Sequence, residues 1–242
     1  MSDQEMYRED ANLYDLIYSG KDYKSEAADV RALIKRYQRS YGKELLDVAC
    51  GTAEHLTFLK QGLRCTGVDI NGGMLRIAKR KLPSIRFVSQ DMTKLALHRR
   101  FDVITCLFSS IGYLRTEGEL SRTFKAFAKH LKPGGVALIE PWLTPEKFKQ
   151  GYPHMTTYNS KKMKIARLSV SSKRGPFSVI DFHWLVAKEG KRVRHFVDHH
   201  ELRLTTSHRL IQLLQAAGLE AKYLEKGLGD RGILVGVKPL VT

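Results

Sequence analysis

The sequence of 242 residues lacks a long hydrophobic run and contains only three cysteines. No apolar stretch approaches the roughly 18 residues that a membrane-spanning helix needs, and the polar, acidic N-terminal stretch shows no secretory signal. Cys50, Cys65 and Cys106 lie in apolar segments and lack the close spacing of metal ligands. We therefore expect a cytoplasmic protein with reduced cysteines and without a disulfide, a bound metal or membrane contact.

Acidic residues are also scarce, since 25 Asp and Glu stand against 41 Lys and Arg, which gives a formal net charge of +16. Such an excess attracts nucleic acids and other polyanions. The basic residues are dispersed, however, and no aromatic-interleaved RNA-binding pattern accompanies them. Three interpretations stay open: a solvated surface, a field that gathers a polyanionic substrate such as a nucleotide diphosphate, and an RNA surface. The RNA surface is the least expected.

Residues 45–52 (LLDVACGT) join an apolar run to a small-residue turn, and the polar stretch 53–55 is typical of a helix start. A strand–turn–helix leaves free backbone N–H groups that bind anions and nucleotides. Gly51 lets a ligand approach the backbone closely. Because Gly51 is the one glycine of this turn, a GxGxxG pyrophosphate clamp is unsupported. The alternative interpretation is an ordinary strand–turn–helix of an α/β protein.

Polar residues also follow the next three apolar segments. Asp69 ends the second segment 18 positions after Gly51, where nucleotide-binding α/β units place an acid that binds a ribose diol. Asp91 follows the third segment, and Ser109 and Ser110 follow the fourth. Ligands of open parallel sheets bind at the carboxyl ends of the strands. The series therefore predicts one ligand site at this edge.

Helical apolar spacing predicts a helix over residues 25–39, capped by Ser25, and another over 117–131. Residues 132–135 (KPGG) predict a turn that ends this second helix. A further strand is expected over residues 136–140.

Between residues 155 and 206 polar and apolar residues alternate, which predicts antiparallel strands with one solvated face. We expect this inserted sheet to cover the ligand edge, and a final helix over 206–217 to precede strands over 220–224 and 233–237. The expected organisation is an N-terminal arm (1–24), a ligand-binding core (25–142), an inserted antiparallel sheet (143–206), and a C-terminal helix and strands that complete the core (207–242).

Motifs along nearly the whole chain resemble a known family. DVACGT, GVDINGGML, QDM and LKPGG are similar to class I S-adenosylmethionine-dependent methyltransferases. LYDLIYSGKDYKSEAADV, FDVITCLFSSIGYL, IEPW, PEKFKQGY, RHFVDHHELRL and GDRGILVGV resemble the nucleotide-linked (dTDP) amino-sugar N,N-dimethyltransferases of deoxysugar biosynthesis. The resemblance implies an α/β fold: a Rossmann-like, seven-stranded, mostly parallel sheet with helices on both faces, plus a small inserted antiparallel β cap.

The resemblance further implies S-adenosyl-L-methionine as cofactor, with S-adenosyl-L-homocysteine as product. In this family pattern Gly51 is the close-approach turn, Asp69 binds the ribose and Asp91 binds the adenine amine, while Ile70 and Met92 sandwich the ring. The implied cofactor-binding set is Ala49, Cys50, Gly51, Asp69, Ile70, Met74, Asp91, Met92 and Leu107.

Ala53 departs from the GTGxH pattern of the family, because this chain has GTAEH. If position 53 needs a positive φ, alanine is strained there and cofactor binding weakens. If the position is already helical, alanine suits it better than glycine. We expect the helical conformation.

The expected reaction is an in-line displacement at an activated methyl, which depends on alignment and water exclusion more than on acid–base groups. Tyr14, on the arm, is expected to close over the sugar and accept a hydrogen bond from the amine. Tyr113 stands where family members often carry histidine, and a tyrosine is a poor base near neutral pH. His183 and His200 on the inserted sheet are expected to orient hydroxyls or take a proton.

Arginine binds diphosphate through its bidentate fork, which makes Arg167 and Arg231 candidates for that part of the substrate. The full set of substrate-binding candidates is Tyr18, Tyr23, Ser109, Trp142, Phe148, Tyr152, Arg167, His195 and Arg231. For each of them the alternative is a structural role in the core or on the surface.

Three functions remain open. The first is methyl transfer to the amine of a nucleotide-linked amino sugar or of another small molecule. The second is methylation of RNA, which is disfavoured because Ser109-Ser110-Ile111-Gly112 stands where an Asn-Pro-Pro-aromatic motif would be. The third is cofactor binding with little activity, which Ala53 motivates. The expected partner is a small-molecule substrate, and the oligomeric state stays open between a monomer and a homodimer formed through the inserted sheet.

Overall fold

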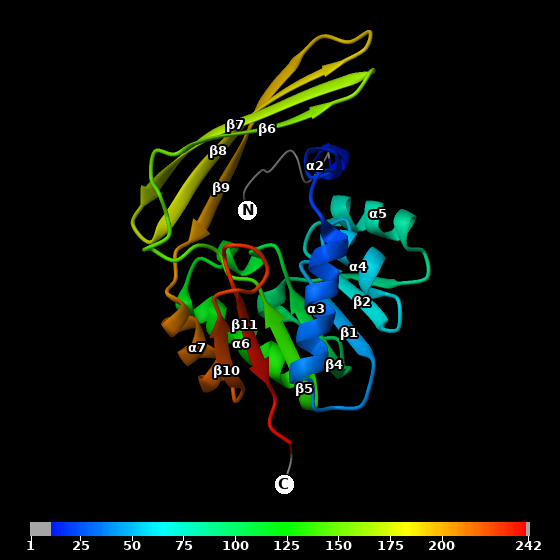
Figure 1. Cartoon of the computed structure of the whole chain (residues 1–242), viewed down its shortest axis with the longest axis vertical. Coiled ribbons are helices and arrows are strands. Elements are labelled where there is room, and N and C mark those ends of the chain that lie inside the picture. Colours follow the sequence, from blue (N-terminus) through cyan, green and yellow to red (C-terminus); the bar gives the residue numbers. More distant parts are fainter. Residues whose placement is uncertain (1–10, 241–242) are drawn as a thin grey trace.

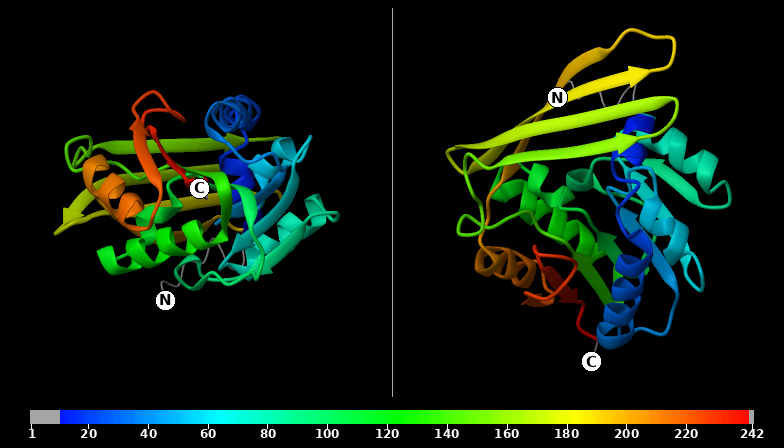
Figure 2. Two further views of the ribbon diagram at one scale, coloured as in Figure 1. Left: turned by 90° about the horizontal axis from the view of Figure 1, so that it is seen from below. Right: turned by 45° about the horizontal axis from the view of Figure 1, so that its top comes forward.

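Two β-sheets organise residues 11–240, which are the part of the chain that the computed structural model describes (Figure 1). The larger sheet has seven strands in the order β10-β11-β5-β4-β1-β2-β3. The smaller sheet has four strands in the order β6-β7-β8-β9 and lies across one end of the larger sheet (Figures 1 and 2). This arrangement confirms the predicted fold class.

The seven-stranded sheet is parallel except for β11, which runs antiparallel between β5 and β10. The chain proceeds outward from β1 to β2 and β3, and then outward on the other side to β4 and β5. A ligand crevice forms at such a reversal, at the carboxyl ends of the strands. The strands are β1 (Glu44–Val48), β2 (Arg64–Asp69), β3 (Arg86–Ser89), β4 (Phe101–Cys106), β5 (Leu131–Ile139), β10 (Glu220–Leu224) and β11 (Ile233–Val237).

Helices cover both faces of this sheet. Val30, Leu56 and Leu75 come from the helices on one face and form a core with Leu45 and Val136 of the sheet. The helices of that face are α3 (Tyr23–Tyr37), α4 (Glu54–Leu59) and α5 (Gly72–Lys81).

The opposite face is covered by α6 (Glu117–His130) and α7 (Ser207–Ala216). Phe124 and Leu214 of these helices pack in one buried cluster with Leu46 and Ile104 of the sheet. Short 3₁₀ turns, η1 (Met92–Lys94) and η2 (Ser110–Tyr113), follow β3 and β4. In the described part of the chain no helix combines the length and the apolar character needed to cross a membrane.

The four-stranded sheet, here called the cap, comprises β6 (Pro153–Asn159), β7 (Met163–Arg174), β8 (Phe177–Lys188) and β9 (Arg194–Arg203). Alternation over residues 155–206 predicted these antiparallel strands, which extend from Pro153 to Arg203. The inner face of the cap rests on the N-terminal helix α2 (Ala11–Ile17), where Leu13 and Ile17 pack with Ile165, Trp184 and Phe196 (Figure 1).

Two local predictions were wrong. Helix α3 is capped by Asp22, whose side chain accepts from the Ser25 N–H at 2.9 Å, so Ser25 lies inside the helix rather than at its cap. The KPGG segment is not a turn, because β5 already starts at Leu131 and a register shift against β4 accommodates the two glycines. Gly134, with φ 76°, makes this irregular start feasible.

Candidate active site

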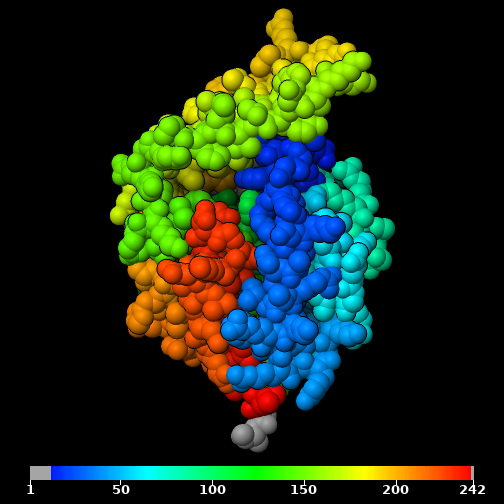
Figure 3. Space-filling model, viewed as in Figure 1, coloured from blue at the N-terminus to red at the C-terminus, as the bar shows by residue number. Residues whose placement is uncertain are grey.

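A cavity of about 860 Å³ lies between the carboxyl edge of the seven-stranded sheet and the inner face of the cap. Its walls come from the N-terminal helix α2, the strand-end loops of the larger sheet, the loop before β6, and strands β6 to β9. In the space-filling view the hollow opens between the cap, the N-terminal helices and the C-terminal loop (Figure 3). The cavity is therefore where the sequence predicted a ligand.

One end of the cavity is formed by the ends of β1 and β2. Asp69, which is 9 % exposed, accepts from the backbone N–H of Gly51 and from that of Asn71, both at 2.8 Å. Burial raises the pKa of this carboxyl, although the backbone hydrogen bonds oppose that shift. Both carboxylate oxygens are thereby fixed at the cavity wall.

Beside Asp69 the wall turns apolar. Ile70 is 70 % exposed, an unusual state for a large aliphatic side chain, and it lines the cavity together with Met74 and Met92. A fixed carboxylate next to an exposed aliphatic surface suits a ligand that carries a diol and a flat ring. These residues fit the ribose and adenine of S-adenosylmethionine.

The turn between β1 and α4 is conformationally unusual. Ala49, Gly51 and Ala53 all have positive φ angles, of 57°, 54° and 67°. The expectation that Ala53 is helical was therefore wrong: Ala53 is the left-handed N-cap of α4, and its methyl group is completely buried. Its conformation costs about 1 kcal/mol relative to glycine, which burial of the methyl group partly offsets.

Asp47 lies beneath this turn, 3 % exposed, and accepts from the Thr105 hydroxyl at 2.7 Å. Burial raises the pKa of Asp47 to about 6. The folded state thus holds an unfavourable charge above pH 6, whereas below about pH 4 the carboxyl is protonated in the folded and the unfolded chain alike. We expect Asp47→Asn to increase the free energy of unfolding by about 2 kcal/mol at pH 8, with the gain fading as the pH falls from 6 to 4.

Urea unfolding of both proteins across this pH range measures the effect. The control is Asp22→Asn, which alters an exposed helix cap and lacks the buried-charge effect. A loss of stability at pH 8 in Asp47→Asn would contradict the assignment of a costly buried charge.

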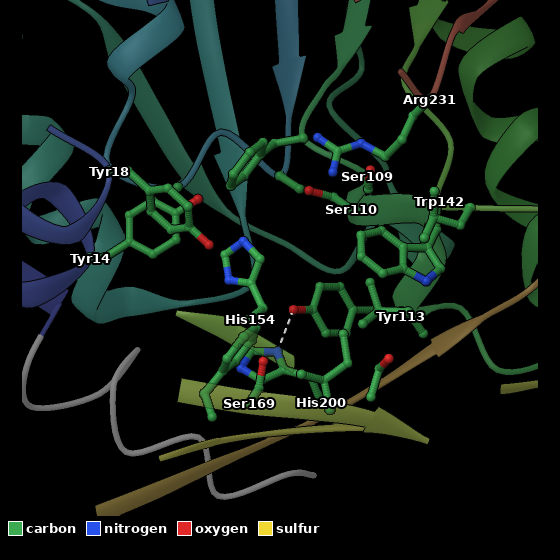
Figure 4. Close-up of a pocket in the computed structure, with 18 of the residues that line it drawn as sticks. Tyr14, Tyr18, Ser109, Ser110, Tyr113, Trp142, His154, Ser169, His200 and Arg231 are labelled. Carbon is green, nitrogen blue, oxygen red and sulfur yellow. Dashed lines mark hydrogen bonds between the residues drawn. The ribbon is translucent and has the colours of Figure 1, made fainter. Parts of the chain in front are cut away.

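Helix α2 is tied to the turn after β1. Asp15 accepts from the Thr52 hydroxyl at 2.6 Å and forms an ion pair with Lys81 at 2.6 Å. This attachment places Tyr14 and Tyr18 at the cavity wall (Figure 4). Both rings lie edge-on to the ring of Phe108. The arm thus forms one wall of the cavity, and the closure of Tyr14 over a sugar stays a prediction.

The loop after β4 carries two consecutive non-glycine residues with positive φ, Phe108 at 55° and Ser109 at 64°. Glu140 holds this strained pair, because its buried carboxylate accepts from the Phe108 N–H at 2.6 Å. Ser109 donates its hydroxyl proton to the Pro141 carbonyl at 2.8 Å. Non-glycine residues in this conformation are typical of functional sites.

Arg231 lines the cavity, but it is not available as a free anion-binding fork. Its guanidinium is paired with Glu140 at 2.7 Å and lies over the rings of Phe108 and Trp142. The expectation that Arg231 binds diphosphate is therefore weakened, because Glu140 already compensates its charge. The pair joins the loop before β11 to the end of β5.

Arg167 on β7 is 4 % exposed and faces the cavity from the cap. It donates to the Tyr18 hydroxyl at 2.9 Å and lies over the rings of Phe182 and Trp184. In the described part of the chain it has no carboxylate partner, and its Nε has no acceptor. A buried guanidinium without a counter-ion favours an anionic ligand at this wall.

Other predicted residues of the wall lie where expected. Tyr113 and His200 both line the cavity, and the Tyr113 hydroxyl lies 2.6 Å from His200 Nδ1 (Figure 4). The predicted set that lines the cavity is Tyr14, Tyr18, Ala49, Gly51, Asp69, Ile70, Met74, Met92, Ser109, Tyr113, Trp142, Phe148, Tyr152, Arg167, His200 and Arg231.

His183 and His195 lie outside the cavity, on the exposed outer face of the cap, where their rings stack at 5.6 Å. The strand register explains this correction. His183 pairs with Val197 and Ile180 pairs with His200, so His183 and His200 stand on opposite faces of the sheet.

Four further candidates do not line the cavity. Tyr23 packs edge-on against His55, and Leu107 is buried in the core. The Cys50 thiol lies against Gly67, and burial raises its pKa. Asp91 caps the 3₁₀ turn η1, accepting from the N–H and the hydroxyl of Thr93.

Sequence reasoning missed the basic residues that come from irregular or polar segments. Lys147 and Lys149 lie in the loop before β6, and His154 lies on β6, and all three line the cavity. Phe182 of β8 completes the aromatic wall. Phe182 and Trp184 are two positions apart on one strand and therefore share a face, which could have identified Phe182. Nothing in the sequence indicates that the two lysines reach the cavity.

Known proteins resemble this chain in sequence and in structure. The profile of the methyltransferase domain family matches residues 45–135. Over 236 residues the chain is 40% identical to dTDP-3-amino-3,4,6-trideoxy-alpha-D-glucopyranose N,N-dimethyltransferase of Streptomyces venezuelae, an alignment that covers 96% of this chain and 99% of that protein. It is 38% identical to dTDP-3-amino-3,6-dideoxy-alpha-D-glucopyranose N,N-dimethyltransferase of Streptomyces fradiae, covering 94% and 90% of the two chains.

Solved structures are also similar to this chain over nearly its whole length. The crystal structure of Streptomyces venezuelae DesVI superposes with a TM-score of 0.90 at 38% identity and covers 95% of this chain and 98% of that one. The structure of S-adenosylmethionine-bound CalS10, an amino pentose methyltransferase from Micromonospora echinaspora, gives a TM-score of 0.85 at 33% identity, covering 93% and 96%.

Proposed function

Because the chain belongs to the family of dTDP-amino-sugar N,N-dimethyltransferases, we propose that it methylates the amine of a dTDP-linked amino sugar. The observation that carries this proposal is one continuous cavity with two different ends. One end offers Asp69, Gly51 and Ile70, and the other offers cationic and aromatic side chains of the cap.

The end at Asp69 fits S-adenosylmethionine, which when bound supplies a methyl group activated by a sulfonium. The Asp69 carboxylate would accept from the ribose diol, since its oxygens are already fixed by two backbone N–H groups. Gly51, with no atom within 4 Å of the place where a side chain would start, leaves the backbone open to close approach. Ile70 and Met92 would cover the faces of the adenine ring.

The opposite end fits a nucleoside diphosphate. Arg167 and His154 of the cap and Lys147 and Lys149 of the loop before β6 surround this part of the cavity. Their charges match the two phosphates, and the net charge of +16 attracts such a polyanion. The other basic residues, which are dispersed along the chain, are explained by a solvated surface.

The reaction needs the amine nitrogen held in line with the methyl group and shielded from water. The arm and the cap provide both, because Tyr14, Tyr18 and Phe108 close one side of the cavity and the cap covers the other. Alignment of this kind supplies a large part of the rate without acid–base groups.

Tyr14 contributes as a hydrogen-bonding group rather than as a base. Burial raises the pKa of its phenol well above the ordinary value of 10, so the group stays protonated throughout the working range. We expect Tyr14→Phe to lower kcat/KM by about 10-fold, the value of one hydrogen bond, by the same factor from pH 7 to pH 9.5. Initial rates of S-adenosylhomocysteine release measure this, and a loss confined to one end of the pH range would contradict the assigned role.

The proposed substrate is tested by comparing acceptors. The enzyme is given S-adenosylmethionine with dTDP-3-amino-3,4,6-trideoxyglucose, the acceptor named for the Streptomyces venezuelae relative, with the same sugar 1-phosphate, or with bulk tRNA. We expect turnover of the dTDP-sugar and a kcat/KM at least 100-fold lower for the sugar phosphate, which lacks the nucleotide. Methylation of tRNA alone would overturn the proposal, and binding of S-adenosylmethionine without any turnover would favour a cofactor-binding protein.

A further inference from the structure

Three side chains form a hydrogen-bonded chain that reaches from the interior of the cap into the cavity. The Tyr113 hydroxyl lies 2.6 Å from His200 Nδ1, and His200 Nε2 lies 2.8 Å from Asp198 Oδ2. Figure 4 shows the Tyr113 hydroxyl directed at His200, below the serine loop that follows β4. Asp198 and His200 are 0% and 3% exposed, whereas Tyr113 is 38% exposed and lines the cavity.

Asp198 is a costly residue for this location. Its carboxylate is completely buried on the inner face of β9. Among the described residues its Oδ1 has no hydrogen-bond partner, and its one ion pair is with His200. A buried carboxylate destabilises a fold unless it is paired. Within the described part of the chain, the His200 imidazole is therefore the group that can compensate the charge of this carboxylate.

The chain also has a defined direction. An ionised carboxylate can only accept, so His200 Nε2 carries the hydrogen that it donates to Asp198. In the neutral imidazole Nδ1 is then an acceptor, and the Tyr113 hydroxyl donates to it. A tyrosine alone is a poor base at neutral pH. A tyrosine that donates its own proton to a histidine can accept another proton at the same oxygen.

We propose that Asp198, His200 and Tyr113 form a relay that removes the proton from the substrate ammonium, with Tyr113 as the catalytic residue and Asp198 as a positioning residue. This inference rests on the proposed function, since it concerns the amine of that substrate. An aliphatic amine has a pKa between about 8 and about 10, so it arrives mostly as an ammonium at pH 7 and has no free electron pair.

In the proposed reaction, proton transfer precedes methyl transfer. The ammonium gives one proton to the Tyr113 oxygen while the Tyr113 proton moves to His200 Nδ1, which leaves a neutral amine, a neutral tyrosine and an imidazolium beside Asp198. The amine electron pair then forms the new C–N bond as the C–S bond breaks, and the sulfur keeps that bond's electrons. The nitrogen is cationic again, and His200 releases its proton to solvent before a second transfer.

The groups near the His200 imidazole come from η2 and from the strands of the cap. Tyr113 of η2 and Asp198 of its own strand contact the imidazole directly, and the uncharged Phe182 of β8 packs against it edge-on at 5.0 Å. His154 of β6 and Arg167 of β7 share the same inner face and disfavour an extra positive charge. Asp198 is therefore the group that makes protonation of His200 feasible.

The test compares Asp198→Asn with Asp181→Asn. The control alters a similar pair on the outer face of the cap, where His199 Nδ1 lies 2.6 Å from Asp181 Oδ1. For turnover of the dTDP-amino sugar we expect Asp198→Asn and Tyr113→Phe to lower kcat/KM by about 10- to 100-fold at pH 7. The loss shrinks to less than about 3-fold near pH 10, because the amine then arrives already deprotonated. Asp181→Asn keeps the wild-type profile.

The double variant Asp198→Asn/Tyr113→Phe is expected to lose no more activity than Tyr113→Phe alone, since both changes break the same relay. An equal loss at every pH would show that Asp198 only maintains the fold, and it would overturn the proposal. Full activity of Asp198→Asn at pH 7 would overturn it as well.

A second readout does not require turnover. NMR titration of the His200 ring in the S-adenosylhomocysteine-bound protein is expected to show that Asp198→Asn lowers the pKa of His200 by about 1 or more, whereas Asp181→Asn leaves it unchanged. An unchanged pKa in Asp198→Asn would overturn the relay. If the wild-type protein fails to methylate the dTDP-sugar while this difference is observed, the proposed substrate has failed and the relay has not.

Discussion

Asp69→Asn is expected to weaken binding of S-adenosylmethionine by at least about 100-fold. The carboxylate holds two backbone N–H groups at 2.8 Å, from Gly51 and Asn71, and would accept from the ribose diol as well. An asparagine accepts through one atom only and turns an N–H₂ group toward the other donors. Loss of hydrogen bonds to a charged group costs about 1.5 to 3 kcal/mol each, so a 100-fold change corresponds to one or two of them.

This loss will not reflect unfolding. Burial raises the pKa of Asp69, which means that the folded chain favours the neutral carboxyl, and a neutral asparagine avoids that cost. Calorimetric titration with S-adenosylmethionine gives the dissociation constant, and thermal unfolding without ligand gives the control. A variant that binds normally would contradict the assignment of Asp69 to the ribose.

Asp91→Asn is the matched comparison. The sequence predicted that Asp91 binds the adenine amine, but the side chain lies off the cavity and one of its oxygens is used by Thr93. We therefore expect a loss of affinity below about 10-fold. A loss equal to that of Asp69→Asn would show that the second Asp91 oxygen reaches the adenine after all.

Arg167→Met is expected to lower kcat/KM for the dTDP-sugar by at least about 100-fold, mainly through KM, while the affinity for S-adenosylmethionine stays unchanged. The guanidinium is buried at the cap wall with hydroxyl and aromatic neighbours, and no carboxylate of residues 11–240 pairs with it. Charged hydrogen bonds to phosphate are among the strong polar interactions, and a bidentate one accounts for this loss. Steady-state kinetics with the acceptor varied at saturating cofactor measure the effect.

Two controls separate this role from packing. Methionine keeps the apolar stem, and replacing a buried charge by an apolar side chain is often neutral or stabilising, so thermal stability should not fall. Arg167→Lys should restore little activity, because an ammonium cannot form the bidentate contact. A normal KM accompanied by reduced stability would assign Arg167 to the packing of Tyr18, Phe182 and Trp184 instead.

The end of the cavity at Asp69 could be predicted because it follows from local sequence. Asp69 comes at the end of a strand whose parallel partner ends at the Gly51 turn, and parallel strands bring their carboxyl ends to one edge. The same reasoning identifies Ile70 and Met92. That Asp91 binds the adenine amine stays a prediction, since one of its carboxylate oxygens caps the short segment after β3 and accepts from Thr93.

The composition of the cavity wall on the cap depends on tertiary register, which no local pattern contains. His183 and His200 look alike in the sequence, yet pairing of β8 with β9 puts them on opposite faces of the cap. Lys147 and Lys149 reach the cavity from an irregular loop. The role proposed for Asp198 depends on its contact with His200, which the sequence does not indicate. The left-handed conformation of Ala53 could not be predicted from the sequence either, because alanine rarely adopts it.

The most direct test of the central claim is to follow methyl transfer to the sugar itself. The protein is incubated with S-adenosylmethionine that carries a deuterated methyl group and with dTDP-3-amino-3,4,6-trideoxyglucose, the acceptor named for the Streptomyces venezuelae relative, and the sugar is analysed by mass spectrometry. We predict that two labelled methyl groups appear on the sugar nitrogen, with a singly methylated species as the intermediate. A sugar without label, in a protein that binds S-adenosylmethionine through Asp69, would contradict the account.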